Sequence, residues 1–253
     1  MTQFSLKLLA MIAMLLDHMA KVVLQAGLLA PWIGLENELL LRNFMIITGR
    51  MALPIFAWFT AEGCRRTSNM RKYMLRLLVF AVLSEVPFQL CFYGAYERGI
   101  HFGCHNVMFT LLLAVGAVYF GACLERRKIP QMVAHWGPAC AAMLLGWFFY
   151  TDYNAWGVAL VLGIYYMPEK KGKLLFLAVW ITVFQLIWHG WNGNGFNWLS
   201  GAGSLQLLYW LGAMFSVPLL AAYSGARGRC GKWMFYVFYP VHLMILFLIT
   251  LAF

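Results

Sequence analysis

The sequence consists almost entirely of long apolar runs separated by short polar loops. The hydrocarbon core of a bilayer is about 30 Å thick, so a helix needs roughly 20 mainly apolar residues to cross it. This pattern predicts an all-α polytopic transmembrane bundle of about nine spans, with residues 1–253 forming a single domain. The predicted spans lie near residues 4–29, 44–64, 73–95, 105–124, 132–150, 154–167, 174–191, 204–223 and 233–252.

The composition of the chain excludes a soluble fold. Of the 253 residues, 63% are hydrophobic and 11% are charged, whereas roughly a quarter of a soluble domain is charged. The net charge of +10 could suggest a nucleic-acid partner, but the basic residues form short clusters between apolar runs. We therefore expect the lipid bilayer as a partner and no nucleic acid.

The basic clusters fall in alternate loops. They lie within residues 65–76, 126–128, 170–173 and 227–232, and the positive-inside rule makes these loops cytoplasmic. The N-terminus is then expected in the cytoplasm and the C-terminus outside. The loops near residues 30–43, 96–104, 151–153 and 192–203 are expected on the outer side.

The six cysteines show no CxxC spacing. This distribution predicts neither a metal site nor a disulfide framework. A bond between Cys91 and Cys104 on the outer side stays open as an alternative.

Three predicted spans carry an ionisable residue at a similar depth. His18 lies about 18 Å along the first span, and Glu85 and His242 lie about 14 to 18 Å from the cytoplasmic ends of theirs. A charge at the bilayer centre costs at least ~2.5 kcal/mol, so such groups normally face a cavity or one another. We therefore expect them to cluster in a buried site.

Local spacing explains some of the other charged residues. Asp17 and Lys21 are four residues apart, which is the spacing of a simple helical ion pair. Glu62 lies three residues before Arg65 and four before Arg66, so it can form a similar pair. Neighbouring helical residues point in different directions, so His18 needs a partner other than that of Asp17. The natural candidates are Glu85 and Asp152, and Arg50 likewise needs an anion, either a carboxylate or a bound ligand.

The order of these residues resembles that of the TraX family, membrane proteins of the type that acetylates the pilin N-terminus in conjugation systems. A weaker similarity extends to the acyltransferase-3-like transmembrane acyltransferases. The TraX resemblance spans nearly the whole chain and rests on Leu16-Asp17-His18, Gly49-Arg50 through Ala57, Glu62-Gly63, Arg76, Ser84-Glu85-Val86-Pro87-Phe88, Asn106 through Thr110, Asp152-Tyr153 with Gly157, and Phe238-Tyr239-Pro240-Val241-His242-Leu243.

This resemblance implies an acetyltransferase of the bacterial cytoplasmic (inner) membrane. The donor would be acetyl-CoA met from the cytoplasm, and the acceptor an amine, as in a peptide or pilin-like N-terminus, or a hydroxyl. Attack on a thioester needs a base and a donor for the developing oxyanion, with no metal required. We predict catalytic roles for His18, Glu85, Arg50, Asp17 and His242, cofactor binding by Arg50, Arg76, Asn106, Arg227 and Arg229, and acceptor binding by Asp152, His105 and Asn106.

Within this hypothesis, the sequence leaves the identity of the base open. His18 can accept the proton, while His242 can be a second base or can carry the acetyl group transiently. A proton-coupled transporter is the alternative function, because Asp, Glu and His in apolar spans also describe a proton relay. A non-catalytic assembly subunit is a third hypothesis, in which the charges only fix helix packing.

Overall fold

The protein is almost entirely helical in the computed structural model, which describes residues 1–25, 27–94, 104–191, 201–228 and 233–252. Within these ranges the β-structure is limited to one isolated bridge between His105 and Thr151. The chain divides into two compact units. The first comprises Met1–Phe56 and Glu169–Phe253, and the second comprises Ala57–Pro168.

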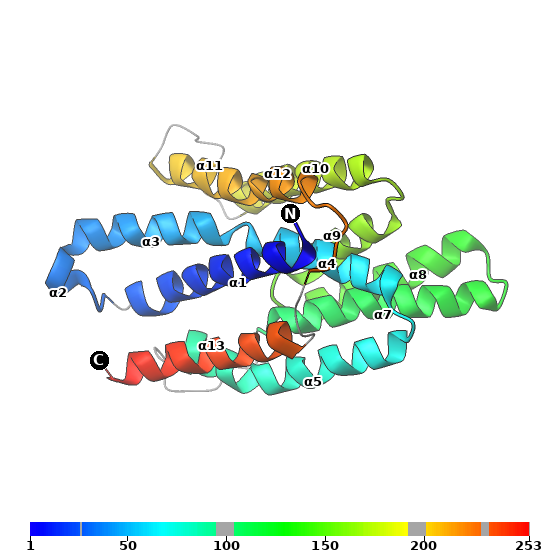
Figure 1. The fold of residues 1–253 in the computed structure, drawn as a ribbon, viewed down its shortest axis with the longest axis horizontal. Helices are drawn as coiled ribbons and strands as arrows, with labels where there is room; N and C mark the ends of the chain where they lie inside the picture. Colours follow the sequence, from blue (N-terminus) through cyan, green and yellow to red (C-terminus); the bar gives the residue numbers. More distant parts are fainter. Residues whose placement is uncertain (26, 95–103, 192–200, 229–232, 253) are drawn as a thin grey trace. The chain divides into compact units, whose positions relative to one another are not determined.

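The first unit is built around the N-terminal helix. Helix α1 (Gln3–Met19) continues into a π-helical turn, η1 (Ala20–Leu24), and a Thr2–Ser5 capping box closes its N-terminus. Helix α1 packs against α3 and α13, and α11 packs against α3 and α10 (Figure 1). The other helices of this unit are α2 (Ala30–Ile33), α3 (Leu35–Gly49), the start of α4 (Ala52–Arg66), α10 (Lys170–Trp191), α11 (Gly201–Met214), α12 (Ser216–Ala221) and α13 (Trp233–Ala252).

The second unit is centred on helix α7 (Val107–Arg126), which packs against α5, α8 and α9. Its inner face is made of small and β-branched residues, among them Ala114 and Val115, which are fully buried. These short side chains let three helices approach one central helix. The remaining elements are the end of α4, α5 (Met70–Gln89), a π-helical turn η2 (Leu90–Gly94), α8 (Gln131–Phe148) and α9 (Asn154–Tyr166).

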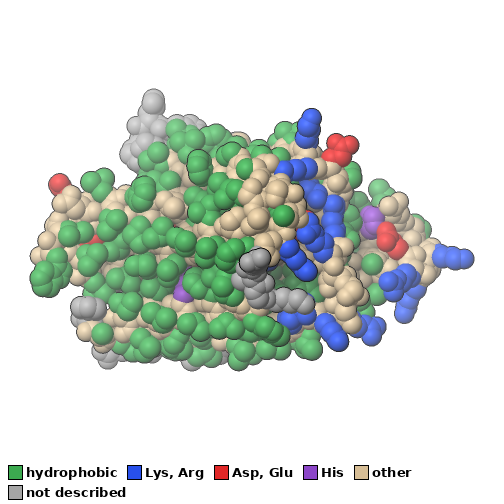
Figure 2. All heavy atoms as spheres, in the orientation of Figure 1, with side chains coloured by type: hydrophobic (Ala, Val, Ile, Leu, Met, Phe, Trp, Pro, Cys, Tyr) green, Lys and Arg blue, Asp and Glu red, His purple; other side chains and the backbone are tan. Residues whose placement is uncertain are grey.

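The surface of the long helices is apolar, as a lipid environment requires. On α13, Val237, Val241, Ile245 and Leu248 are 45 to 55% exposed and follow one another at helical spacing. Figure 2 shows hydrophobic side chains covering much of the face in view, with Lys and Arg confined mainly to its right-hand half. The chain is therefore a membrane protein whose helices expose apolar faces to lipid.

Four helical segments among the described residues are long and apolar enough to cross a membrane. They are Leu35–Arg66, Met70–Tyr93, Val107–Arg126 and Trp233–Ala252. Two shorter apolar helical segments cover Asn154–Tyr166 and Leu205–Ala221. The prediction of an all-α membrane protein is confirmed, whereas the number of nine spans and their orientation go beyond this observation.

The prediction of a loop near residues 30–43 is wrong, because α2 covers Ala30–Ile33 and α3 begins at Leu35, while the side of the membrane stays a prediction. The first turn of α3 holds Glu36 and Glu38 at the positive end of the helix dipole. The Glu38 side chain is only 2% exposed and its carboxylate accepts a hydrogen bond from the Leu29 backbone N–H. Polar residues that suggested a loop therefore serve to start a helix.

A close approach between α3 and α11 gives a test of the packing in the first unit. A Cβ added at Gly212 would collide with the backbone carbonyl of Ile47. We expect Gly212→Ala to lower the free energy of unfolding by about 1–3 kcal/mol, because the helices must separate. Thermal unfolding of the purified protein in detergent measures this effect.

The matched control is Gly116→Ala in the second unit. Its added methyl would touch only the Met74 Cε, at 3.8 Å, which is ordinary van der Waals contact. Alanine also favours helix over glycine by roughly 1 kcal/mol, so this variant should unfold at or above the wild-type temperature. Equal losses in the two variants would contradict the close approach.

Candidate functional site

Two histidines from opposite ends of the chain meet in the first unit. His18 lies near the end of α1 and His242 in the middle of α13, and a hydrogen bond of 2.8 Å joins His18 Nδ1 to His242 Nε2. Their rings are nearly parallel, with centroids 5.0 Å apart. His242 is buried, at 4% exposure, whereas His18 is only partly buried. His18 is thus the more exposed member of the pair.

The hydrogen-bond partners of His242 define the tautomers of both neutral rings. The Nδ1 of His242 lies 2.8 Å from the backbone carbonyl of Phe238, which can only accept. Nδ1 of His242 must then carry the hydrogen, so its Nε2 accepts from Nδ1–H of His18. The second nitrogen of His18, Nε2, is therefore unprotonated and basic.

Aromatic rings surround the histidine pair. The Phe238 ring stacks on His242 with centroids 4.6 Å apart, and Tyr239 meets both imidazoles edge-on, at 6.4 Å from His18 and 5.5 Å from His242. Pro240, inside α13, has no N–H to donate. The pair is held between aromatic faces that restrict ring rotation.

Asp17 and Arg50 lie where α1 and α3 pack closely. Asp17 pairs with Lys21 one turn further along the chain, as its spacing predicted. A Cβ at Gly49 would collide with the Asp17 side chain, so the glycine permits this approach. Arg50 follows as the C-cap of α3, where a cation is favourable for the helix dipole, and its guanidinium lies 5.1 Å from the centroid of the Tyr209 ring.

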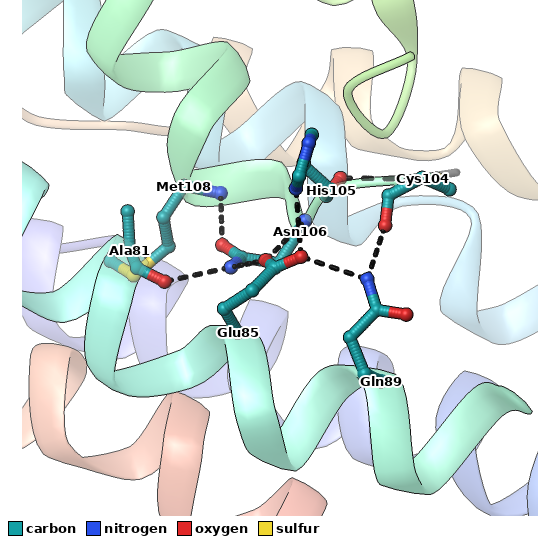
Figure 3. Close-up of polar contacts among 7 residues, drawn as sticks. All are labelled: Ala81, Glu85, Gln89, Cys104, His105, Asn106 and Met108. Carbon is teal, nitrogen blue, oxygen red and sulfur yellow. Dashed lines mark hydrogen bonds and ion pairs between the residues drawn. The ribbon is translucent and has the colours of Figure 1, made fainter. Parts of the chain in front are cut away.

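A second polar cluster, in the second unit, is centred on the carboxylate of Glu85 (Figure 3). Its Oε1 accepts from Gln89 Nε2 and lies 2.8 Å from His105 Nδ1. Its Oε2 accepts from the Asn106 side-chain amide, at 2.7 Å, and from the Asn106 backbone N–H, at 3.2 Å. These donors satisfy both oxygens of a carboxyl group of which only 14% of the side chain is exposed.

The Glu85 cluster also fixes the backbone around it. Asn106 caps α7 by accepting from the Met108 N–H, and its amide donates to the Ala81 carbonyl. Gln89 donates to the Cys104 carbonyl, at 2.6 Å. Burial raises the pKa of the Cys104 thiol, so this cysteine stays protonated and is a poor nucleophile.

Asp152 lies beside this cluster, because its backbone is hydrogen-bonded to the segment that holds His105. The Asp152 N–H donates to the His105 carbonyl, at 2.7 Å, and the Asp152 carbonyl accepts from the Thr110 hydroxyl. A Cβ at Gly157 would lie 2.6 Å from Thr110 Cγ2, so α9 and α7 meet closely here. The structure therefore brings together the residues predicted for acceptor binding and adds Glu85 to them.

The partner of His18 differs from the sequence-based prediction. Glu85 and Asp152 were the natural candidates, but His18 forms its hydrogen bond with His242, and Glu85 bonds His105 and Asn106. The pairs Asp17–Lys21 and Glu62–Arg66 are confirmed. Cys91 and Cys104 are free thiols.

The residues predicted to contact the cofactor are dispersed along the chain. Arg227 is exposed in the loop after α12, where its carbonyl accepts from the Phe4 N–H at the start of α1. Arg76 on α5 lies over the Tyr73 ring, and its Nε has no hydrogen-bond acceptor among the described residues. Arg229 lies outside the described residues, as do most of the predicted loops near 96–104 and 192–203.

Sequence reasoning missed Gln89, Tyr239 and Tyr209 as parts of these clusters. Gln89 stands four residues after Glu85, the same spacing that identified the Asp17–Lys21 pair, so the signal was present. Tyr239 stands in the motif around His242, so a signal was present there too, whereas no local pattern separates Tyr209 from the many other aromatic residues. A π-helical turn follows each cluster, η1 after His18 and η2 after Gln89, and such turns are rare and frequent at functional sites.

The Glu85 cluster predicts that Asn106 has two separable structural roles. Asn106→Ala should lower the free energy of unfolding by about 1–3 kcal/mol, because it removes the α7 cap, the amide donor to the Ala81 carbonyl and one of the two donors to Glu85 Oε2. Asn106→Ser restores a capping oxygen and should recover about 1 kcal/mol of that loss. Unfolding in detergent measures both values, and a wild-type stability of Asn106→Ala would contradict the assignment.

Comparison with known proteins is consistent with these features. The TraX protein family matches residues 3–250 of the chain. The chain is also 30% identical, over 269 aligned residues, to a probable fimbrial assembly protein FimC, serogroup H1, of Dichelobacter nodosus, with 96% of this chain and 93% of that protein covered. No solved structure matches it. This match over nearly the whole length places the chain in the TraX family.

Proposed function

We propose that this protein is a membrane-embedded acetyltransferase that uses cytoplasmic acetyl-CoA. The observation that carries the proposal is the histidine pair, in which His242 fixes the tautomer of a partly accessible His18. Membership of the TraX family and a relative named for fimbrial assembly favour a particular acceptor. This acceptor is the N-terminal amine of a pilin-like or fimbrial subunit, with a hydroxyl as the chemical alternative.

In the proposed reaction, His18 is the general base. The acceptor nitrogen attacks the thioester carbonyl carbon and transfers a proton to Nε2 of His18 as the new N–C bond forms. The C–S bond then breaks, and the coenzyme A thiolate takes the proton from the imidazolium. His242 is a positioning residue, because its Nε2 accepts from Nδ1–H of His18 and stabilises the charge that develops there.

Two arginines of the first unit would bind the anionic groups of the reaction, which are the oxyanion and the phosphates of acetyl-CoA. Arg50, at the end of α3, follows the glycine that packs against Asp17, and in the proposed reaction its guanidinium stabilises the oxyanion of the tetrahedral intermediate. Arg227 is exposed next to the start of α1, and its guanidinium suits the phosphates of acetyl-CoA. The catalytic role predicted for Glu85 and the acceptor-binding roles of Asp152 and His105 stay predictions. Asn106 already uses its amide to position Glu85.

A proton-coupled transporter is the alternative function, because a proton relay also uses groups that accept and release protons. The bond from His242 Nδ1 goes to the Phe238 carbonyl, which has no proton to release, and His242 Nε2 is bonded to His18. These bonds orient the His18 ring, which suits a base that serves one acceptor.

The proposed topology has nine spans in the bacterial inner membrane, with the N-terminus in the cytoplasm. Support comes from the four candidate spans, from the further apolar helices, and from basic residues in alternate loops. An odd number of spans places the two chain ends on opposite sides. Fusions of a periplasm-dependent phosphatase to each end should therefore be active only at the C-terminus, and activity at both ends or at neither would exclude nine spans.

The test of the reaction is transfer of labelled acetyl from acetyl-CoA to a peptide with a free N-terminal amine. We expect His18→Ala to reduce kcat by about 10²–10⁴-fold, which is the usual contribution of a general base. His242→Ala should reduce kcat less and leave KM for acetyl-CoA near its wild-type value, because the base is present but poorly oriented. Ile12→Ala, at an exposed position of α1, is the control and should keep kcat near the wild-type value.

The relative effects of the two histidine substitutions distinguish the possible roles. Wild-type turnover in His18→Ala would remove His18 from the mechanism. A larger loss in His242→Ala than in His18→Ala would make His242 the base. Acetyl-CoA binding by the purified variants, measured by calorimetry, separates a lost catalytic group from a lost fold.

A further inference from the structure

Helices α5, α7 and α8 of the second unit enclose an apolar groove of about 690 Å³. Its walls come from residues 74–78 of α5, 112–124 of α7 and 133–145 of α8, and its lining residues carry only apolar side chains or none. Small residues keep it open. Gly116 and Ala141 line it, and a Cβ added at Gly116 would meet only the flexible end of Met74.

Large apolar side chains of the groove remain accessible. Leu75 is 59% exposed, Phe120 57% and Val133 56%, one from each of the three helices. A surface of this kind in a membrane protein is in contact with acyl chains or with another apolar helix. We therefore expect an apolar molecule or segment to occupy the groove.

The length of the groove favours an acyl chain over a helix. Along α7 it runs from Leu112 to Leu124, which at 1.5 Å per residue is about 18 Å. One leaflet of the hydrocarbon core is about 15 Å deep, half of the full ~30 Å. A transmembrane helix would make contacts over the whole thickness, whereas a lipid chain ends at the bilayer centre.

Cations lie at one end of the groove. Arg71, one turn before the first lining residue of α5, donates through Nε to the Tyr119 hydroxyl at 2.6 Å, beside Phe120, and its side chain is exposed. Exposed basic residues also follow Leu124 at the end of α7, and this end of the unit is rich in Lys and Arg in Figure 2. The nearby Glu125 carboxylate forms an ion pair with His135. The exposed basic residues at this end are Arg126, Arg127 and Lys128.

We propose that this groove binds one anionic phospholipid, with an acyl chain along α7 and the phosphate beside Arg71. The apolar walls match the chain, and the cationic end matches the headgroup, as in other basic pockets between transmembrane helices. An anionic phospholipid bound in the groove would stabilise the packing of α5, α7 and α8 against one another. It is independent of the acetyl-transfer proposal, because it uses none of the residues assigned to that reaction.

Native mass spectrometry of the full chain, released from detergent with palmitoyl-oleoyl phosphatidylglycerol or phosphatidylcholine, tests the site. The wild type should retain phosphatidylglycerol in preference to phosphatidylcholine. Arg71→Gln should reduce that preference by about fivefold, the effect of one cation near an anionic headgroup. Ala141→Leu should reduce retention of both lipids by about tenfold, because the side chain fills the space of about two methylenes.

Two further variants keep the experiment decisive. Gly116→Leu fills the groove from the opposite wall and should reproduce the effect of Ala141→Leu if that variant folds poorly. Ala122→Leu is the matched control, an exposed position of α7 that does not line the groove, and should retain lipid as the wild type does.

Several results would overturn the proposal. Equal retention of the two lipids by the wild type would exclude the headgroup site. Unchanged retention in both groove-filling variants would exclude the acyl-chain site. Loss of a chemically cross-linked dimer in those variants, with lipid retention unchanged, would show instead that a second copy of the chain occupies the groove.

Discussion

Every polar group that enters an apolar helical bundle must find its hydrogen bonds within the protein. The Glu85 carboxylate shows how far this constraint reaches, because four donors from Gln89, His105 and Asn106 satisfy its two oxygens. Asn106 is at the same time the cap of α7, and the backbone of His105 bonds to Asp152 just before α9. The Glu85 carboxyl group is thus bonded to the cap of α7 and to the segment that connects to the start of α9, and unpaired polar groups here would be destabilising.

The histidine pair meets the same constraint in a different way. The Glu85 cluster satisfies a carboxyl group with several donors, whereas in the histidine pair His18 is bonded to His242, and His242 is bonded to the Phe238 carbonyl. These bonds leave one ring nitrogen of His18 basic without placing a permanent charge in the bundle. Low charge at rest and readiness to accept a proton are the properties that acyl transfer requires of a base.

Prediction from sequence succeeded where interactions are local along a helix. The pairs Asp17–Lys21 and Glu62–Arg66 follow directly from a spacing of four residues, because helix geometry places such side chains together. It failed for the partner of His18, since the depth of a residue in a span gives no information on which helices are neighbours. The prediction of a loop near residues 30–43 was wrong for a related reason. Glu38 is not exposed to water but buried, and its carboxylate accepts a hydrogen bond from the Leu29 backbone N–H.

The sequence by itself determined that this chain is an all-α membrane protein and that it resembles the TraX family, because apolar run length and ordered motifs are properties of the linear chain. Only the tertiary structure decided that His18 meets His242, 224 residues away, that Glu85 is held by His105 and Asn106, and that three helices leave an apolar groove. These features depend on which helices pack together. Packing is set by the fit of small residues such as Gly49 and Gly212 against neighbouring helices, and that fit has no signature in local sequence.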